Sequence, residues 1–115
     1  MKNITIKTLR AFDKKSNKLM TNKVLEELYD YLLLNPTSGD LIKGTGGVRK
    51  IRWKTGKSNK GKSSGVRVIY YYDNDLLIIL LSLYAKSEKE NLTISEKNTI
   101  RKILPQIISN MKEDL

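Results

Sequence analysis

Hydrophobic and polar residues alternate in two neighbouring segments in the middle of the chain. In residues 48–54 (VRKIRWK), Ile51 and Trp53 alternate with basic residues, which predicts a strand with one apolar and one charged face. Residues 66–72 (VRVIYYY) continue as a second strand, followed by a short turn of Asp and Asn residues. The apolar run LLIILLSLY, residues 76–84, predicts a third, central strand that is buried on both faces. These segments together predict a three-stranded antiparallel meander.

Helical periodicity flanks this meander on both sides. Thr21 can cap a helix whose Leu and Val residues recur at helical spacing until an Asn-Pro pair ends it. Thr93 and Glu96 form a capping box, so a final helix is expected from there, and Pro105 is expected to kink or interrupt it. A short strand over residues 4–8 opens the chain, and the polar stretch between it and the first helix is assigned to no element.

This order of elements predicts the α+β fold class. With 115 residues and no repeat or long linker, we expect a single domain over residues 1–115, built on a small antiparallel sheet of the meander and the N-terminal strand. The apolar side chains Ile51 and Trp53 are expected under the first helix. Lys50 and Arg52 are expected on the opposite face.

The sequence contains no cysteine and no histidine. Disulfides, thiol nucleophiles, Cys-type zinc sites and all mechanisms that use His are therefore excluded, and we expect no metal and no cofactor. The apolar run 76–81 is far shorter than the roughly 20 residues of a membrane span. The segment MKNITIKTLR lacks the apolar core of a signal peptide. We expect a cytoplasmic protein that has no membrane partner.

Positive charge is concentrated in one part of the chain. The 22 Lys and Arg residues exceed the 12 Asp and Glu residues, for a formal net charge of +10. Residues 41–72 hold nine basic and no acidic residues. Because such a cluster attracts a polyanion by releasing counterions, nucleic acid is the leading partner class. The alternative is a solvated basic surface with no specific partner.

One motif in this basic segment has the pattern of a nucleotide-binding loop. Residues 56–63 (GKSNKGKS) match G-x-x-x-x-G-K-[ST]. A phosphate-binding loop opens a helix, whereas the residues that follow here are β-branched and aromatic. We therefore expect this segment to join two strands of a hairpin, and we expect no nucleotide cofactor.

Three segments in order, GDLIKGTGGVRKIRWK, KGKSSGVRVIYYY and LLSLYAKSEKENLT, resemble the HigB-like branch of the RelE/ParE superfamily of type II toxin-antitoxin toxins. The resemblance extends from about Thr8 to Leu104. It implies a RelE-like fold with the helices on one face of the sheet and a basic concave surface on the other. It also implies a ribosome-dependent mRNA endonuclease that inhibits translation, with a cognate antitoxin, the ribosome and mRNA in the decoding site as partners. The alternatives are a ParE-like inhibitor of DNA gyrase and a non-catalytic RNA-binding module.

Metal-independent RNA cleavage by the 2′-hydroxyl needs a base, a group that stabilises the five-coordinate phosphate, and an acid for the leaving oxygen. Arg suits phosphate stabilisation, and Lys or Tyr can transfer protons. Arg67 is the leading candidate. It lies in an otherwise apolar strand, where an unpaired charge is costly, so its side chain must either face the open side of the sheet or be paired. The alternative is a structural Arg held by Asp40 or Asp73. The other catalytic candidates are Lys50, Arg52, Lys86, Tyr84 and Tyr71, and the candidates for contact with RNA or the ribosome are Arg49, Lys54, Lys57, Lys60 and Lys62.

The sequence departs from the family at one aromatic position. RelE-type members place a Tyr in the C-terminal segment where this chain has Asn-Leu-Thr at residues 91–93. Tyr71 shares a strand face with Arg67, and Tyr84 ends the third strand, so either side chain could stack on a base or transfer a proton. The tyrosines on both sides of Tyr71 are expected in the core.

Overall fold

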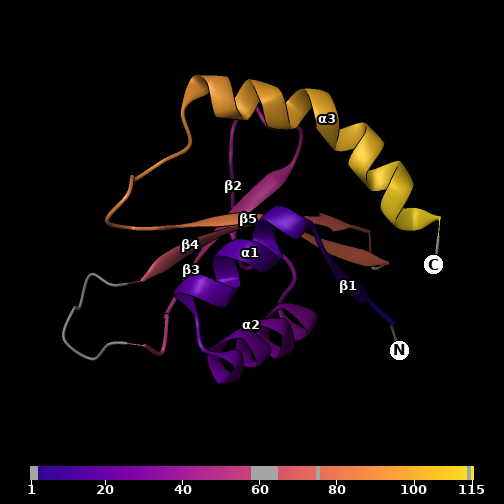
Figure 1. The fold of residues 1–115 in the computed structure, drawn as a ribbon. Coiled ribbons are helices and arrows are strands. Elements are labelled where there is room, and N and C mark those ends of the chain that lie inside the picture. Colours follow the sequence, from indigo (N-terminus) through magenta and orange to yellow (C-terminus); the bar gives the residue numbers. More distant parts are fainter. Residues whose placement is uncertain (1–2, 58–64, 75, 114) are drawn as a thin grey trace.

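The computed structural model describes residues 3–57, 65–74, 76–113 and 115. Three helices and a five-stranded sheet make up the fold (Figure 1). The strands are β1 (Thr5–Thr8), β2 (Asp40–Leu41), β3 (Val48–Trp53), β4 (Val66–Asp73) and β5 (Leu77–Ala85), and the helices are α1 (Arg10–Leu19), α2 (Asn22–Leu34) and α3 (Ile94–Lys112).

The sheet has the strand order β1-β5-β4-β3-β2. The antiparallel meander of β3, β4 and β5 confirms the sequence prediction. The sheet as a whole is mixed, because β1 pairs with β5 in parallel, and the two-residue strand β2 adds a fifth strand beside β3. The expectation of a wholly antiparallel sheet is wrong at β1. A parallel neighbour needs a crossover connection, and the chain between β1 and β5 supplies it.

Helices cover both faces of the sheet, in contrast to the expectation that all helices lie on one face. Helices α1 and α2 pack on one face through Phe12, Leu28 and Leu32. Helix α3 lies across the other face, where Leu104 is its buried residue (Figure 1). The physical reason lies in β5, whose side chains are buried on both faces and therefore need apolar cover on both.

The charged strand β3 has the predicted orientation. Ile51 and Trp53 are half-buried against the core under α2, and the Trp53 indole Nε1 donates a hydrogen bond to Val24 O at 3.0 Å. Lys50 lies on the opposite face, because its Nζ reaches Asn91 Oδ1 at 2.8 Å. The prediction that one face of this strand is apolar and the other basic is confirmed.

The helix ends follow the capping residues of the sequence. The Thr21 hydroxyl accepts from Val24 N at the start of α2, and a complete capping box of Thr93 and Glu96 opens α3. Of the two outcomes expected at Pro105, a kink or an interruption, the interruption does not occur, because α3 continues through this residue, and the ribbon of the helix bends (Figure 1). Helix α1 was not predicted, since its sequence is mostly polar and Phe12 and Ser16 are its buried residues.

Segment 56–63 lies partly outside the described residues, so its loop conformation is not assigned for residues 58–64. The chain enters strand β4 at Val66, soon after this segment. Because the next described element after segment 56–63 is a strand, this segment connects two strands, β3 and β4, and does not precede a helix as a phosphate-binding loop does. No helix among the described residues is long and apolar enough to cross a membrane.

Candidate active site

Strand register brings the basic candidates together on the α3 face of the sheet. Arg52 pairs with Arg67, and Arg67 pairs with Tyr84 on the next strand. Lys50 lies two residues before Arg52, opposite Ile69, so alternation places it on the same face. Three adjacent strands therefore present one row of Arg, Arg and Tyr with a Lys beside it.

Arg67 is the buried cation of this row, with a relative exposure of 6%. Its guanidinium has no hydrogen bond or ion pair with another residue in the described part of the chain. The alternative hypothesis was that Arg67 is a structural residue held by Asp40 or Asp73. Asp73 instead forms an ion pair with Lys112 at 2.6 Å. A buried cation without a counterion is costly for folding, and such costs are often found at functional sites.

Arg67 and Arg52 line a first hollow of about 480 Å³, which we call the basic hollow. Its other lining residues are Trp53, Lys54, Gly65 and Lys86. Among the described residues no carboxylate belongs to this lining, and four of them, Arg52, Lys54, Arg67 and Lys86, are cationic. Crowded Arg and Lys side chains of this kind bind phosphate oxygens.

The same two arginines also line a second hollow of about 330 Å³, which we call the mixed hollow. Its other lining residues are Ser38, Asp40, Lys50, Ile51, Glu90 and Asn91. The Lys50 Nζ donates to Asn91 Oδ1, so a member of segment 91–93, where the family Tyr was missing, is part of the site. Sequence reasoning did not find Asp40, Glu90 or Asn91 as site residues, because they lie in or beside connections that have no periodicity.

Tyr84 is buried, and its hydroxyl donates to Glu90 O at 3.1 Å. Burial raises the pKa of this phenol above its ordinary value, while the charge of Arg67 opposes part of the rise. Tyr84 is therefore neutral near pH 7 and acts as a hydrogen-bond donor. It lines a third, mostly apolar hollow of about 380 Å³ between α1, β5 and α3.

Of the remaining candidates, the three that the structure describes, Tyr71, Arg49 and Lys57, line neither of the two arginine-lined hollows. Tyr71 is half-buried and packs against the core under α3, and Arg49 points to the opposite face, where it donates to Thr37 O and Gly39 O at 3.0 and 2.7 Å. Lys57 Nζ donates to Lys18 O. Lys60 and Lys62 lie outside the described residues.

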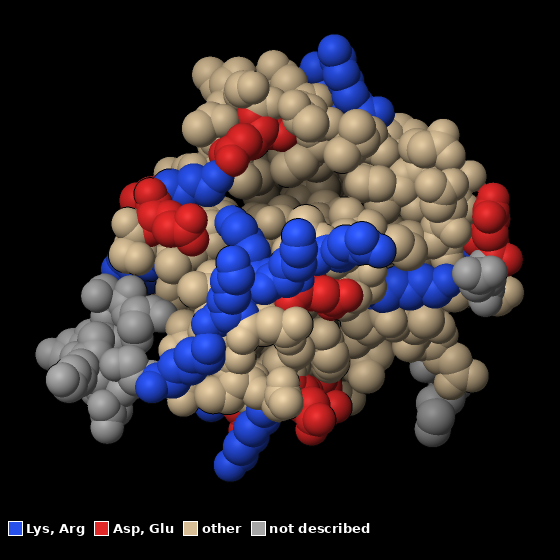
Figure 2. All heavy atoms as spheres, viewed as in Figure 1, with Lys and Arg blue, Asp and Glu red and all other residues tan. Residues whose placement is uncertain are grey.

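A second group of basic side chains lies on α1, which sequence reasoning did not single out. Figure 2 shows a band of Lys and Arg across the face of the molecule where α1 lies. The sequence of α1, RAFDKKSNKL, contains four basic residues. The hydrogen bond from Lys57 to Lys18 O connects this band to the end of β3, so the basic surface is wider than segment 41–72 alone.

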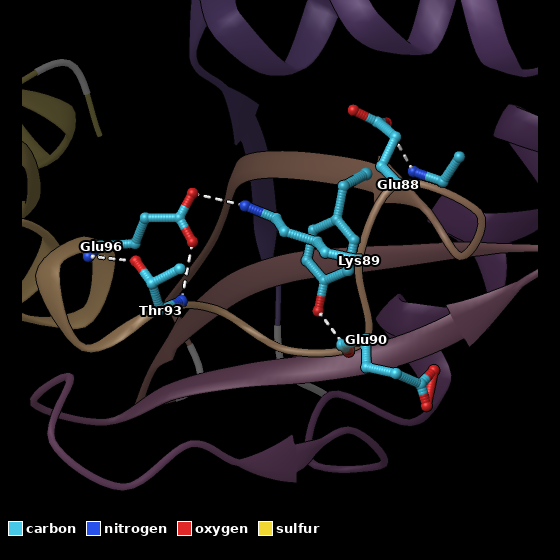
Figure 3. A network of polar contacts seen from close by, with 7 residues as sticks. Glu88, Lys89, Glu90, Thr93 and Glu96 are labelled. Atoms are coloured by element: carbon cyan, nitrogen blue, oxygen red, sulfur yellow. Dashed lines mark hydrogen bonds and ion pairs between the residues drawn. The ribbon is translucent and has the colours of Figure 1, made fainter.

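A polar network holds the connection between β5 and α3 (Figure 3). Lys89 forms an ion pair with Glu96, and its Nζ lies 5.0 Å from the centre of the Tyr84 ring. Glu96 also accepts from Thr93 N at 2.8 Å. The hydrogen bond from Lys89 is the main cause that lowers the pKa of Glu96, and the backbone bond from Thr93 adds to it.

This network predicts a dependence of stability on pH. The pKa of Glu96 is lower in the folded chain than in the unfolded chain, so ionised Glu96 stabilises the fold above its unfolded pKa, and this contribution is lost as the pH falls through the folded value. We expect the melting temperature of Glu96→Gln to fall less than that of the wild type between pH 5 and pH 3, measured by circular dichroism. Glu113→Gln, an exposed change at the other end of α3, should behave as the wild type. Identical profiles for Glu96→Gln and the wild type would contradict the prediction.

In the part of the chain that is described, no group of three or more Asp and Glu side chains is arranged to hold a metal ion. The described side chains that line the two arginine-lined hollows offer guanidinium, ammonium, indole, carboxylate, amide and hydroxyl groups.

Comparison with known proteins establishes the fold. No family model matches the sequence. The structure is similar to that of the Escherichia coli toxin RelE, solved in the free state as a variant with two arginines replaced by alanine. The similarity has a TM-score of 0.56 at 19% sequence identity and covers 88% of this chain and 98% of that chain. The chain thus has the RelE-like α+β fold over nearly its whole length.

Proposed function

We propose that this chain is the toxin of a type II toxin-antitoxin pair, of the HigB-like branch, and that it cuts mRNA in the decoding site of the ribosome. The observation that carries the proposal is the juxtaposition of Arg52 and Arg67, on a RelE-like fold, in a hollow whose described lining contains no carboxylate. A fold alone does not define a function. Here the fold is combined with a buried, unpaired cation that has a cost for folding and a use in phosphate chemistry.

In this proposal, the basic hollow holds the phosphate that is cleaved. Arg67 and Arg52 bind its non-bridging oxygens and stabilise the charge that develops on them in the transition state. Lys50 and Lys86 each share a hollow with both arginines, Lys50 in the mixed hollow and Lys86 in the basic hollow. One of them removes the proton of the 2′-hydroxyl and the other donates a proton to the leaving 5′-oxygen.

Tyr84 has a positioning role in this proposal. Its hydroxyl is committed to Glu90 O, and its pKa is raised by burial, so it is poorly suited to act as a base near neutral pH. The hydrogen bond from Tyr84 to Glu90 O fixes the connection between β5 and α3, which borders the mixed hollow through Glu90 and Asn91. Tyr71, which lines neither arginine-lined hollow, has no contact with the RNA in this arrangement.

The ribosome and the antitoxin are the proposed partners. The basic side chains of α1 and of residues 54–57 extend the cationic surface beyond the two arginine-lined hollows, and this surface would contact ribosomal RNA through phosphate. The ribosome would also hold the message in line for attack, a positioning effect that a small isolated site does not supply.

A translation extract tests the proposal. The purified protein is added to an extract that translates a defined message, and the message ends are mapped by primer extension. We expect new ends inside the coding region that require translation and vanish when initiation is blocked. A gyrase supercoiling assay is run in parallel. Inhibition of supercoiling without message cleavage would support the ParE-like alternative, and binding of RNA without cleavage would support a non-catalytic module.

A further inference from the structure

The two arginine-lined hollows share Arg52 and Arg67 but differ in the rest of their lining. The basic hollow adds Lys54 and Lys86, whereas the mixed hollow adds one lysine, Lys50, together with two carboxylates, an amide and a hydroxyl: Asp40, Glu90, Asn91 and Ser38. The described lining of the basic hollow attracts a phosphate through cations alone, whereas the two carboxylates of the mixed hollow offset most of the attraction of its cations. The second space is therefore suited to a part of the substrate other than the phosphate.

The carboxylates of the mixed hollow are available to a ligand. Neither Asp40 nor Glu90 forms an ion pair or a side-chain hydrogen bond with another described residue. Figure 3 shows the Glu90 carboxylate directed away from the Lys89–Glu96 pair. Arg67, buried and unpaired, borders the same space. The Asp40 and Glu90 carboxylates and the Arg67 guanidinium thus border one hollow without pairing with one another, whereas Lys50 and Asn91 of the same hollow do form a hydrogen bond.

The backbone on one side of the mixed hollow is held by buried groups. The Tyr70 hydroxyl donates to Pro36 O and accepts from Gly39 N, both at 2.9 Å. A side chain at Gly39 would meet the Tyr70 ring at 2.8 Å, so only Gly fits there. Arg49 also donates to Thr37 O and Gly39 O. The connection that carries Ser38 and Asp40 is therefore fixed before any ligand binds.

The other side of the mixed hollow is held by the site residues themselves. Tyr84 donates to Glu90 O, and Lys50 donates to Asn91 Oδ1. With both borders fixed, the space is preorganised, which lowers the entropic cost of binding. Its volume is near the lower end of ligand pockets, in keeping with a small planar group.

We infer that the mixed hollow binds the nucleobase next to the cleaved phosphate and selects bases that carry an amino group. This inference rests on the proposed function. Carboxylates accept hydrogen bonds from the exocyclic amino groups of cytosine, adenine or guanine, and the neighbouring cations donate to the ring or carbonyl acceptors of the same base edge. Uracil has no exocyclic amino group, and its one ring donor, N3–H, lies between two carbonyl oxygens that would face the carboxylates. Asp40 and Glu90 are thus specificity-determining residues.

The inference is tested with sets of four messages. Within a set, the messages differ only in the base at one nucleotide beside the cleaved bond, and a separate set is used for the nucleotide on each side of that bond. We expect the wild type to cut the uracil message roughly 5- to 100-fold more slowly than the best of the other three at one position, the range that one well-placed base contact provides. Glu90→Gln and Asp40→Asn should each reduce this ratio toward 1. Both residues are exposed, so the variants should keep the wild-type circular dichroism spectrum.

Matched control variants separate selection of the base from a general effect of removing a negative charge. Glu26→Gln and Asp30→Asn make the same charge changes at exposed positions of α2 and should leave all four rates unchanged. Three results would overturn the inference: no discrimination against uracil by the wild type, the same discrimination in both site variants, or variants that cut all four messages faster by one factor. The last result would mean that the carboxylates only neutralise the arginines.

A binding measurement keeps this inference separate from the proposed function. If the wild type cuts no message, the proposed function fails, and the base preference is then measured by titrating the free protein with the four nucleoside 3′-monophosphates and following the Asn91 side-chain amide by NMR. Weaker binding of the uridine nucleotide, lost in Glu90→Gln, would support the mixed hollow as a base site. Equal binding of all four nucleotides would refute it.

Discussion

Replacing Arg67 with alanine is expected to abolish growth arrest and to slow message cleavage about 10²- to 10³-fold, because losing one group that stabilises transition-state charge has this effect. The guanidinium borders both arginine-lined hollows and has no partner among the described residues. Its proposed role is therefore charge stabilisation and not support of the fold. The measurement is single-turnover cleavage on a programmed ribosome, with growth after induction as a second readout.

The stability of this variant distinguishes a functional from a structural Arg67. Removing a structural Arg leaves a buried carboxylate unpaired and destabilises the protein strongly. Removing an unpaired buried cation leaves no such group, so Arg67→Ala should keep a melting temperature near or above that of the wild type. Arg101→Ala, an exposed change on α3, is the matched control and should cut at the wild-type rate. Cleavage by Arg67→Ala near the wild-type rate would refute the assignment.

Local patterns in the sequence predicted most of the elements and their orientation. The alternation around Ile51 and Trp53 predicted which face of β3 is apolar, and the Thr93 capping box predicted the start of α3. These features depend on neighbours in the chain, which the sequence displays directly. The same alternation already puts Arg49 on the Trp53 face, away from Arg67, although Arg49 was included among the candidates for RNA contact.

Features that depend on distant contacts could not be predicted in this way. Helix α1 is stabilised by the burial of Phe12 against the sheet, not by a periodic apolar face of its own. The position of α3 depends on the connection after β5, although an apolar strand buried on both faces already required cover on both. The mixed hollow is lined both by Asp40, at the start of β2, and by Glu90, in the connection between β5 and α3. These residues are 50 positions apart in the sequence, so no local pattern predicts that they lie at the same site.

A message with a 2′-deoxy or 2′-O-methyl sugar at the cleaved nucleotide is expected to resist cutting completely on the time scale that degrades the unmodified message. The residues around the basic hollow are Arg, Lys and Trp with one Gly. Such residues can bind phosphate and transfer protons, and the proposed nucleophile is the 2′-hydroxyl of the RNA itself. Its attack on phosphorus breaks the bond to the 5′-oxygen and leaves a 2′,3′-cyclic phosphate, or its 3′-phosphate product, and a free 5′-hydroxyl.

The products and the pH profile give independent checks on this mechanism. The chain has no imidazole, and free Lys and Tyr titrate near pH 10, so the cleavage rate should rise through neutral pH without an inflection near 6.5. The control message carries the 2′-O-methyl sugar three nucleotides away from the cleaved bond and should be cut at the unmodified rate. Rapid cutting of the 2′-deoxy message, or products that bear a 5′-phosphate, would mean that water is the nucleophile. In that case the arginines would still bind phosphate, but the roles proposed for Lys50 and Lys86 would be wrong.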